Sequence, residues 1–192
     1  MASSSFAEYF DASIKALAEA RAAFDDERIA RAVGIIVGAL GRGQPLLICG
    51  NGGSAADAQH ITGELVGQFL RKRRALNAVC LVANPAVLTA WANDFEFNDV
   101  FARQVEAHAV PGAVLLAIST SGNSENVVRA AITARKLGLP VVSLTGRGGG
   151  RLAPHTDVLL DVPSSETPYI QQVHICLYHF ICKRIEEDLA GP

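Results

Sequence analysis

The sequence predicts an α/β protein with a doubly wound, five-stranded parallel sheet flanked by helices. Five short apolar runs alternate with longer helical patterns along the chain. These runs are nearly continuous in apolar residues, which is typical of strands buried on both faces. The length of 192 residues, 49 % of them apolar, suits one domain with a full core. We therefore expect a single domain over 1–192, with a helical segment at 1–42 and a sheet–helix core at 43–192.

Two amphipathic helices precede the first predicted strand. The first covers 6–20 and places Phe6, Phe10, Ile14 and Leu17 on one stripe. The second begins after Asp25 or Asp26 and ends at "GRGQ". Such helices either cover the sheet or pack against a second subunit, and the pattern favours a mixture of both.

The remaining elements alternate. Strands are predicted over 45–50, 77–83, 113–119, 140–146 and 157–163. Helices are predicted over 54–70, 86–92, 100–109, 124–138 and 168–189. In sheets of this kind, ligands bind beyond the carboxyl ends of the strands. The loops after the first four strands are therefore where we expect a site.

Composition excludes several classes of protein. The net charge of -2 leaves no broad cationic field for nucleic acid, and the basic cluster at 71–74 is expected to be a solvated helix end. No apolar run approaches the roughly 18 residues of a membrane span, and no signal peptide is apparent. The four cysteines are expected to be small core residues in a reducing compartment: Cys49, Cys80, Cys176 and Cys182. These features predict a cytoplasmic protein.

The loop after the first strand spells G-x-G-x-x-A from Gly50 to Ala55. A dinucleotide site would also need an acidic residue at the end of the second strand, where Asn84 stands instead. No G-K-[ST] follows either, so we expect no nucleotide cofactor. The alternatives are a plain tight turn, or a backbone loop that binds an anion or an oxygen-rich ligand at a helix N-terminus.

The loop after the third strand contains four hydroxyl side chains, on Ser119, Thr120, Ser121 and Ser124. One of them would suffice as a helix cap. Four hydroxyls and free backbone N–H groups before a helix, with no Lys or Arg expected nearby, favour a site for a monophosphate. Elsewhere, Asn93 and Asp94 either bind sugar hydroxyls or end a helix as an Asx turn.

Polar side chains on two helices are candidates for chemistry. Four of them form one stripe on the helix that begins at the glycine loop: Asp57, His60, Glu64 and Gln68. His60 and Glu64 are close enough to share a metal or a substrate, although an exposed polar face is the alternative.

The apolar last helix carries four polar side chains that are candidates for chemistry: Gln171, Gln172, His174 and His179. The alternative is that each is a buried polar residue whose hydrogen bonds are satisfied by a neighbour. Gln171 and His179 lie about 12 Å apart along a regular helix. For both to bind one ion, Gln171 must precede the regular helix or two chains must contribute.

Four stretches together resemble a known family: "CGNGGSAADAQHITGE", "LTAWANDF", "AISTSGNSENVV" and "TPYIQQVHICLYH". They are similar to the sugar isomerase (SIS) domain proteins, and within them to phosphoheptose isomerases. The resemblance covers nearly the whole chain. It departs from the family pattern at Gln172, where many members have an acid, and at "WAND", where "IGND" is more usual.

The resemblance implies a homotetramer with active sites at subunit junctions and one Zn²⁺ ion per site. The implied ligands of the ion are His60, Glu64, Gln171 and His179. The implied substrate contacts are Asn51, Gly52, Gly53, Glu64, Asn93, Asp94, Ser119, Thr120, Ser121, Ser124 and Gln171. Glu64 would be the catalytic base and His179 the catalytic acid.

The implied reaction converts sedoheptulose 7-phosphate to D-glycero-D-manno-heptose 7-phosphate through a cis-enediol, which feeds heptose synthesis for a glycan such as lipopolysaccharide. The main alternative is a non-catalytic SIS tetramer that binds the replication initiator protein. The full set of His60, Glu64, Gln171 and His179 favours an enzyme. An isomerase for another sugar phosphate is a further alternative. A sugar-phosphate-sensing regulator is disfavoured because the N-terminal helices are not basic.

Overall fold

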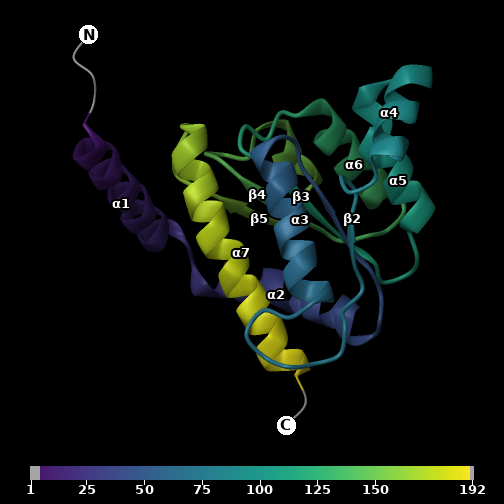
Figure 1. The fold of residues 1–192 in the computed structure, drawn as a ribbon, viewed down its shortest axis with the longest axis horizontal. Coiled ribbons are helices and arrows are strands. Elements are labelled where there is room, and N and C mark those ends of the chain that lie inside the picture. Colours follow the sequence, from purple (N-terminus) through teal and green to yellow (C-terminus); the bar gives the residue numbers. More distant parts are fainter. Residues whose placement is uncertain (1–4, 191–192) are drawn as a thin grey trace.

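The computed structural model describes residues 5–190 and contains a five-stranded sheet in the order β2-β1-β3-β4-β5. Every neighbouring pair of strands is parallel (Figure 1). The strands are β1 (Leu46–Cys49), β2 (Ala78–Cys80), β3 (Val114–Ser119), β4 (Val141–Thr145) and β5 (Val158–Asp161). The predicted fold class is confirmed. The proposal of a single domain rests on this one continuous sheet.

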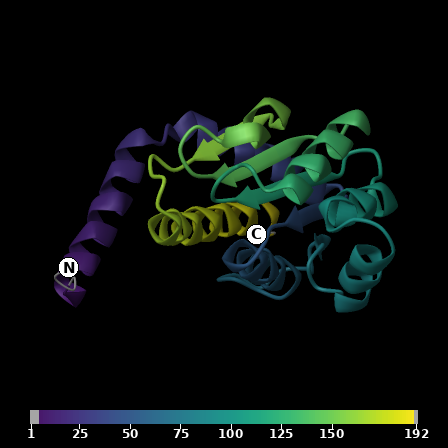
Figure 2. The same cartoon turned by 90° about the horizontal axis from the view of Figure 1, so that it is seen from above.

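Helices cover both faces of the sheet. They are α1 (Phe6–Ala23), α2 (Asp26–Gly41), α3 (Gly53–Val66), α4 (Pro85–Asp94), α5 (Val100–His108), α6 (Glu125–Lys136) and α7 (Thr167–Leu189), with 3₁₀ turns η1 (Phe97–Asp99) and η2 (Gly150–His155). Alternate residues of each strand face opposite sides. Leu46 and Ile48 pack in the cluster with α2, α3 and α7, whereas Leu47 and Cys49 pack with α5 and α6. The sheet is therefore the middle layer of three, as Figure 2 shows.

The two N-terminal helices have different roles. Five residues of α2 are buried against the sheet: Ala32, Val33, Ile36, Ala39 and Leu40. Helix α1 instead lies beside α7, away from the sheet (Figures 1 and 2). It buries only Ser13, Ala16 and Ala20, and its predicted apolar stripe stays exposed, from 80 % at Phe6 to 39 % at Leu17. Of the two N-terminal helices, only α2 covers the sheet.

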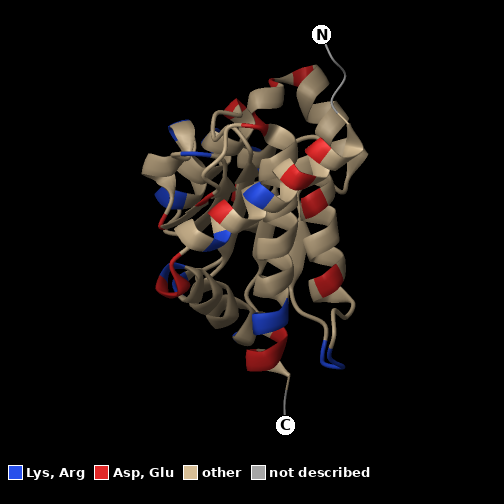
Figure 3. Cartoon of the chain, turned by 90° about the vertical axis from the view of Figure 1, so that its left-hand side faces the viewer, with Lys and Arg blue, Asp and Glu red and all other residues tan. Residues whose placement is uncertain are grey.

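The prediction of a helix over 54–70 with a solvated basic end is wrong at its C-terminus. Helix α3 ends at Val66, and the next residues form a loop. The backbone N–H groups of Phe69, Leu70 and Arg71 donate to the carboxylate of Glu186 on α7 instead of continuing the helix. Arg73 forms a buried ion pair with the same carboxylate, N–O distance 3.1 Å. The basic loop appears in blue at the lower right of Figure 3, where charges of both signs are otherwise interspersed.

The cysteines are also more varied than predicted. All four are free thiols, and Cys49 and Cys182 are buried as expected. Cys176 is exposed, because it lies on the side of α7 that lines an open cavity beneath α1. Among residues 5–190, the structure contains no helix whose length and apolar character would let it span a bilayer.

Candidate active site

The two candidate ligand loops meet where the strand order reverses. Strands β1 and β3 are hydrogen-bonded neighbours, so the glycine loop after β1 and the hydroxyl loop after β3 leave the same sheet edge side by side. A pair of amides joins the loops: Asn51 and Asn126 each donate to the other's oxygen, at 2.8 and 2.9 Å. In doubly wound sheets this reversal point is the usual ligand crevice.

The hydroxyl loop is not explained by helix capping. Ser124 occupies the N-cap position of α6, but its side chain makes no capping hydrogen bond. Its hydroxyl accepts one from Ser119 at 3.1 Å instead. The Ser121 hydroxyl accepts from the backbone N–H of Asn123, also at 3.1 Å. The N–H of Val127 donates to the Ser124 carbonyl, which leaves the N–H groups of Glu125 and Asn126 at the start of α6 as candidates to bind an anion together with the loop.

An acidic residue at this helix start is neutralised. Glu125 would repel a phosphate, but Arg129 donates to it at 2.9 Å and Arg151 at 2.6 Å. These two arginines, in that order, hold the pKa of Glu125 below its ordinary value. The expectation that no arginine lies near the hydroxyl loop is wrong once the chain is folded. In three dimensions Arg151 is next to the loop, and its backbone N–H donates to Asn123.

Three side chains on α3 and α7 converge as a metal-binding group would. His60 Nε2 lies 3.0 Å from Glu64 Oε1 and 3.5 Å from His179 Nε2. The ligand atoms of the three residues all lie within 4.8 Å of one another. Two imidazole nitrogens and a carboxylate, with an open fourth position, are the donor set of many catalytic zinc sites. The residues present therefore fit the divalent ion that the resemblance implies.

A buried pair stands behind His60. The hydroxyl of Tyr178 lies 2.9 Å from Nδ1 of His60 and 3.5 Å from Oδ1 of Asp57. Burial raises the pKa of the Asp57 carboxyl, although Tyr178 and His60 act in the opposite direction. Neither Tyr178 nor Asp57 is open to solvent, so both act on the site through His60.

Gln171 does not join this cluster within one chain. It lies inside α7, which begins at Thr167, so it does not precede the regular helix. Helices α3 and α7 run parallel, because Gly53 meets Gln171 at one end and His60 meets His179 further along. Any side chain at position 53 would collide with the Gln171 amide. Of the two explanations offered by the sequence, only a contribution from a second chain remains for Gln171 as a ligand.

The predicted sugar-binding pair Asn93 and Asp94 lies apart from the cluster. Both are exposed at the end of α4, where the Asn93 amide donates to Asp94 at 2.8 Å. Helix α4 lies on the far side of α3 from α7 in both views (Figures 1 and 2). The single chain therefore leaves this pair outside the group formed by His60, Glu64 and His179.

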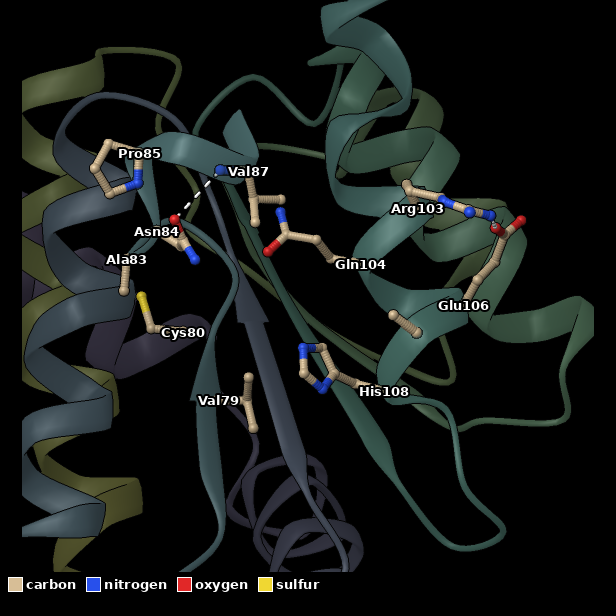
Figure 4. Close-up of a pocket in the computed structure, with 11 residues that line it drawn as sticks. Val79, Cys80, Ala83, Asn84, Pro85, Val87, Arg103, Gln104, Glu106 and His108 are labelled. Carbon is tan, nitrogen blue, oxygen red and sulfur yellow. Dashed lines mark hydrogen bonds and ion pairs between the residues drawn. The ribbon is translucent and has the colours of Figure 1, made fainter. Parts of the chain in front are cut away.

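A cavity of about 670 Å³ lies elsewhere, between the edge strand β2 and helices α4 and α5 (Figure 4). None of its lining residues belongs to the predicted site. Two of its polar side chains have partners: Gln104 donates to the carbonyls of Leu81 and Val100, and Arg103 pairs with Glu106.

The sequence did not single out Asn126, Tyr178 or Arg151, although the structure ties each of them to a predicted residue. Asn126 reads as an ordinary first-turn residue, and Tyr178 as one more apolar position of the last helix. The available signal for a second layer of residues around His60 was that Tyr178 precedes His179 and that Asp57 lies one turn before His60.

Comparison with known proteins assigns the family. Residues 8–146 match the SIS domain. The chain belongs to the SIS domain family. Among curated members, the phosphoheptose isomerase of Crocosphaera subtropica is 54 % identical over 157 residues, which cover 82 % of this chain and 80 % of the relative.

Solved structures of the family agree with the fold. The phosphoheptose isomerase GmhA of Neisseria gonorrhoeae superposes with a TM-score of 0.88 at 42 % identity. A phosphoheptose isomerase of Francisella tularensis gives a TM-score of 0.90 at 38 % identity. In both comparisons the match covers 94 % of this chain and 96 % of the solved chain.

Proposed function

We propose that this protein is a sugar-phosphate isomerase that converts sedoheptulose 7-phosphate to D-glycero-D-manno-heptose 7-phosphate. The similarity to phosphoheptose isomerases over more than four fifths of the chain supports this activity. The observation that carries it is the convergence of His60 and Glu64 on α3 with His179 on α7, whose ligand atoms all lie within 4.8 Å of one another. A protein that only binds a phosphosugar would not need two imidazoles and a carboxylate at this position.

The dimensions of the site suit a long sugar phosphate. His60 follows Gly53 by seven positions on α3, which is about 10 Å of helix. A heptose 7-phosphate carries its phosphate and its reacting carbons at opposite ends of the sugar. In our proposal the phosphate binds Ser119, Thr120, Ser121 and Ser124, and the reacting end lies near His60. Asn51, Gly52 and Gly53 contact the sugar between these ends.

The chain supplies both proton-transfer groups of the proposed reaction. Glu64 takes a proton from C1 of the ketose to give a cis-enediol, and a proton is returned at C2. His179 moves protons between the two substrate oxygens. General acid–base catalysis of this kind contributes roughly 10²–10⁴-fold to the rate.

We assign the metal as Zn²⁺, held by His60, Glu64 and His179. When bound, it polarises the substrate oxygens and favours the negative charge of the intermediate. Gln171 completes the proposed ligand set from a neighbouring chain, since within its own chain it lies about two helical turns before His179 on α7. Asn93 and Asp94 reach the sugar in the same way, across a subunit junction. These assignments require the proposed homotetramer.

Substitution of Glu64 by Gln tests the function. The variant keeps the shape of the side chain but cannot take up a proton. We expect turnover of sedoheptulose 7-phosphate, read as aldose formation, to fall by roughly 10²-fold or more. Wild-type enzyme treated with a chelator should lose activity and regain it with zinc.

The matched control is Glu106→Gln, which removes an exposed carboxylate that pairs with Arg103. This variant should keep wild-type turnover. Wild-type turnover by Glu64→Gln would exclude Glu64 as the base. If the wild-type protein is inactive on the heptose phosphate but binds a replication initiator protein, the proposed isomerase activity is wrong and the alternative binding function is supported.

The proposed product is a precursor of heptose-containing glycans such as lipopolysaccharide. We place the reaction in the cytoplasm, because four free thiols suit a reducing compartment.

A further inference from the structure

Tyr178 joins the metal-binding group to a buried carboxylate. The ring of Tyr178 is 1 % exposed, and its hydroxyl lies between Nδ1 of His60 and Oδ1 of Asp57. The other ring nitrogen of His60, Nε2, faces Glu64 and His179. We infer that Tyr178 and Asp57 are positioning residues that hold the proton of neutral His60 on Nδ1 and keep Nε2 free to bind the metal.

Two arrangements of protons are compatible with these contacts. A tyrosine hydroxyl has one proton to donate, and a neutral imidazole has one N–H. If Tyr178 donates to His60 Nδ1, the ring proton lies on Nε2 and blocks it as a ligand. If Tyr178 donates to Asp57, its oxygen accepts the proton of Nδ1–H, and Nε2 carries a free lone pair.

Asp57 selects the second arrangement. Its side chain is nearly buried, and Oδ2 has no hydrogen-bond partner among the described residues. The hydroxyl of Tyr178 donates to the other oxygen, Oδ1. Turning this hydroxyl toward His60 would remove that donor from a carboxylate that water scarcely reaches. Burying an unpaired carboxylate costs more than leaving an imidazole nitrogen unbonded, so the hydroxyl proton stays on the Asp57 side.

Helix geometry makes the arrangement rigid. Asp57, His60 and Glu64 follow one another at spacings of three and four on α3, and therefore share one face. Tyr178 and His179 are consecutive on α7, so the Tyr178 side chain is buried while that of the half-buried His179 faces His60. Metal-binding histidines usually donate their second N–H to a carboxylate or carbonyl. Here a tyrosine hydroxyl stands between the imidazole and the carboxylate.

Zinc affinity of the full chain gives the first test. Tyr178→Phe removes only the hydroxyl, and we expect zinc binding, measured by competition with a chromogenic chelator, to weaken 10–100-fold. Tyr169→Phe is the matched control, because it removes a hydroxyl from the same helix outside the cluster, and it should bind zinc as the wild type does. Circular dichroism checks that both variants fold. Wild-type affinity in Tyr178→Phe would overturn the inference.

The tautomer of His60 gives a second test that needs neither metal nor substrate. In the metal-free wild type, long-range ¹H–¹⁵N correlation should show His60 as the Nδ1–H form. Tyr178→Phe and Asp57→Asn should shift the ring toward Nε2–H, an effect that loss of stability alone would not produce. An Nε2–H tautomer in the wild type would overturn the inference.

A double substitution tests whether the two residues act in series. Because Asp57 acts through Tyr178, Asp57→Asn should cost zinc affinity in the wild type but little more in Tyr178→Phe. Additive losses of zinc affinity would contradict the inference that Asp57 acts on His60 through Tyr178. The inference rests on the proposed function only for the role of the metal. If the chain has the Nδ1–H tautomer and binds zinc tightly but has no isomerase activity, the proposed function is wrong, whereas the positioning of His60 by Tyr178 and Asp57 is still supported.

Discussion

At the scale of single residues, burial decides which histidine can take up a proton. His174 is fully buried within α7, and its Nε2–H donates to the carbonyl of Thr145 at 3.1 Å. Nδ1 has no partner in the described chain. Burial lowers the pKa of His174 to about 4, although the bond to Thr145 acts in the opposite direction. The side chain is a buried core residue with one of its two ring nitrogens hydrogen-bonded, and it takes no part in the proposed chemistry.

This depressed pKa predicts acid sensitivity. The unfolded chain binds a proton at His174 below about pH 6.5, whereas the folded chain does not until about pH 4. The unfolded state therefore binds more protons in this window, and stability falls as the pH falls through it. Between pH 7.5 and 5.0 His174 should cost about 2 kcal/mol of unfolding free energy.

Urea unfolding at these two pH values measures the difference. His174→Gln keeps an N–H donor but cannot titrate, so its stability should fall by about 2 kcal/mol less than that of the wild type. Equal losses in the two proteins would show that His174 is not the responsible group.

At the scale of elements, α7 organises the face of the sheet that carries the group formed by His60, Glu64 and His179. Its early turns contact the glycine loop through Gln171, its middle carries Tyr178 and His179, and its last turns hold the basic loop through Glu186. Burial raises the pKa of Glu186, but three backbone N–H groups and Arg73 outweigh it and hold the value below normal. The loop after α3 is thereby fastened to the helix that completes the site.

Removal of Arg73 should destabilise this connection. Arg73→Met leaves the Glu186 charge buried without its cationic partner, which typically costs about 3–5 kcal/mol. Lys72→Met is the control, since Lys72 is exposed on the same loop and its loss removes the same charge. The control should change the unfolding free energy by no more than about 0.5 kcal/mol. Similar stabilities of the two variants in urea would contradict the structural role of the pair.

At the scale of the whole molecule, the protomer leaves an apolar surface uncovered. The exposed stripe of α1 adjoins a cavity of about 280 Å³ between α1, α2 and α7, lined in part by Leu17, Phe24 and Phe180. Exposed apolar surface of this extent, on a helix that packs against α7 with only one side, favours a protein interface. This surface supports the proposed homotetramer.

A charge placed on the stripe should therefore change the assembly. Phe10 is 54 % exposed, so Phe10→Glu should fold but should lower the mass measured by sedimentation equilibrium below that of the wild-type protein. Lys15→Gln alters the net charge equally on the opposite side of α1 and should assemble normally. A Phe10→Glu protein with wild-type mass would remove α1 from the interface.

The sequence predicted most of the fold because its signals are local. Apolar runs and helical periods located five strands and seven helices, with small errors at their ends. The clearest error, at the end of α3, arose because Glu186 lies more than one hundred residues away and accepts the N–H groups that would have continued the helix. Likewise, the exposure of Cys176 depends on how α1 lies beside α7, which periodicity does not encode.

The sequence by itself determined the fold class, the two ligand loops and the pairing of His60 with Glu64, because each depends on residues only a few positions apart. Only the tertiary structure decided that His179 meets that pair while Gln171 does not, and that Tyr178 connects His60 to Asp57. The physical reason is that α3 and α7 pack in parallel in one register, and that register is set by burial and close approach over the whole core.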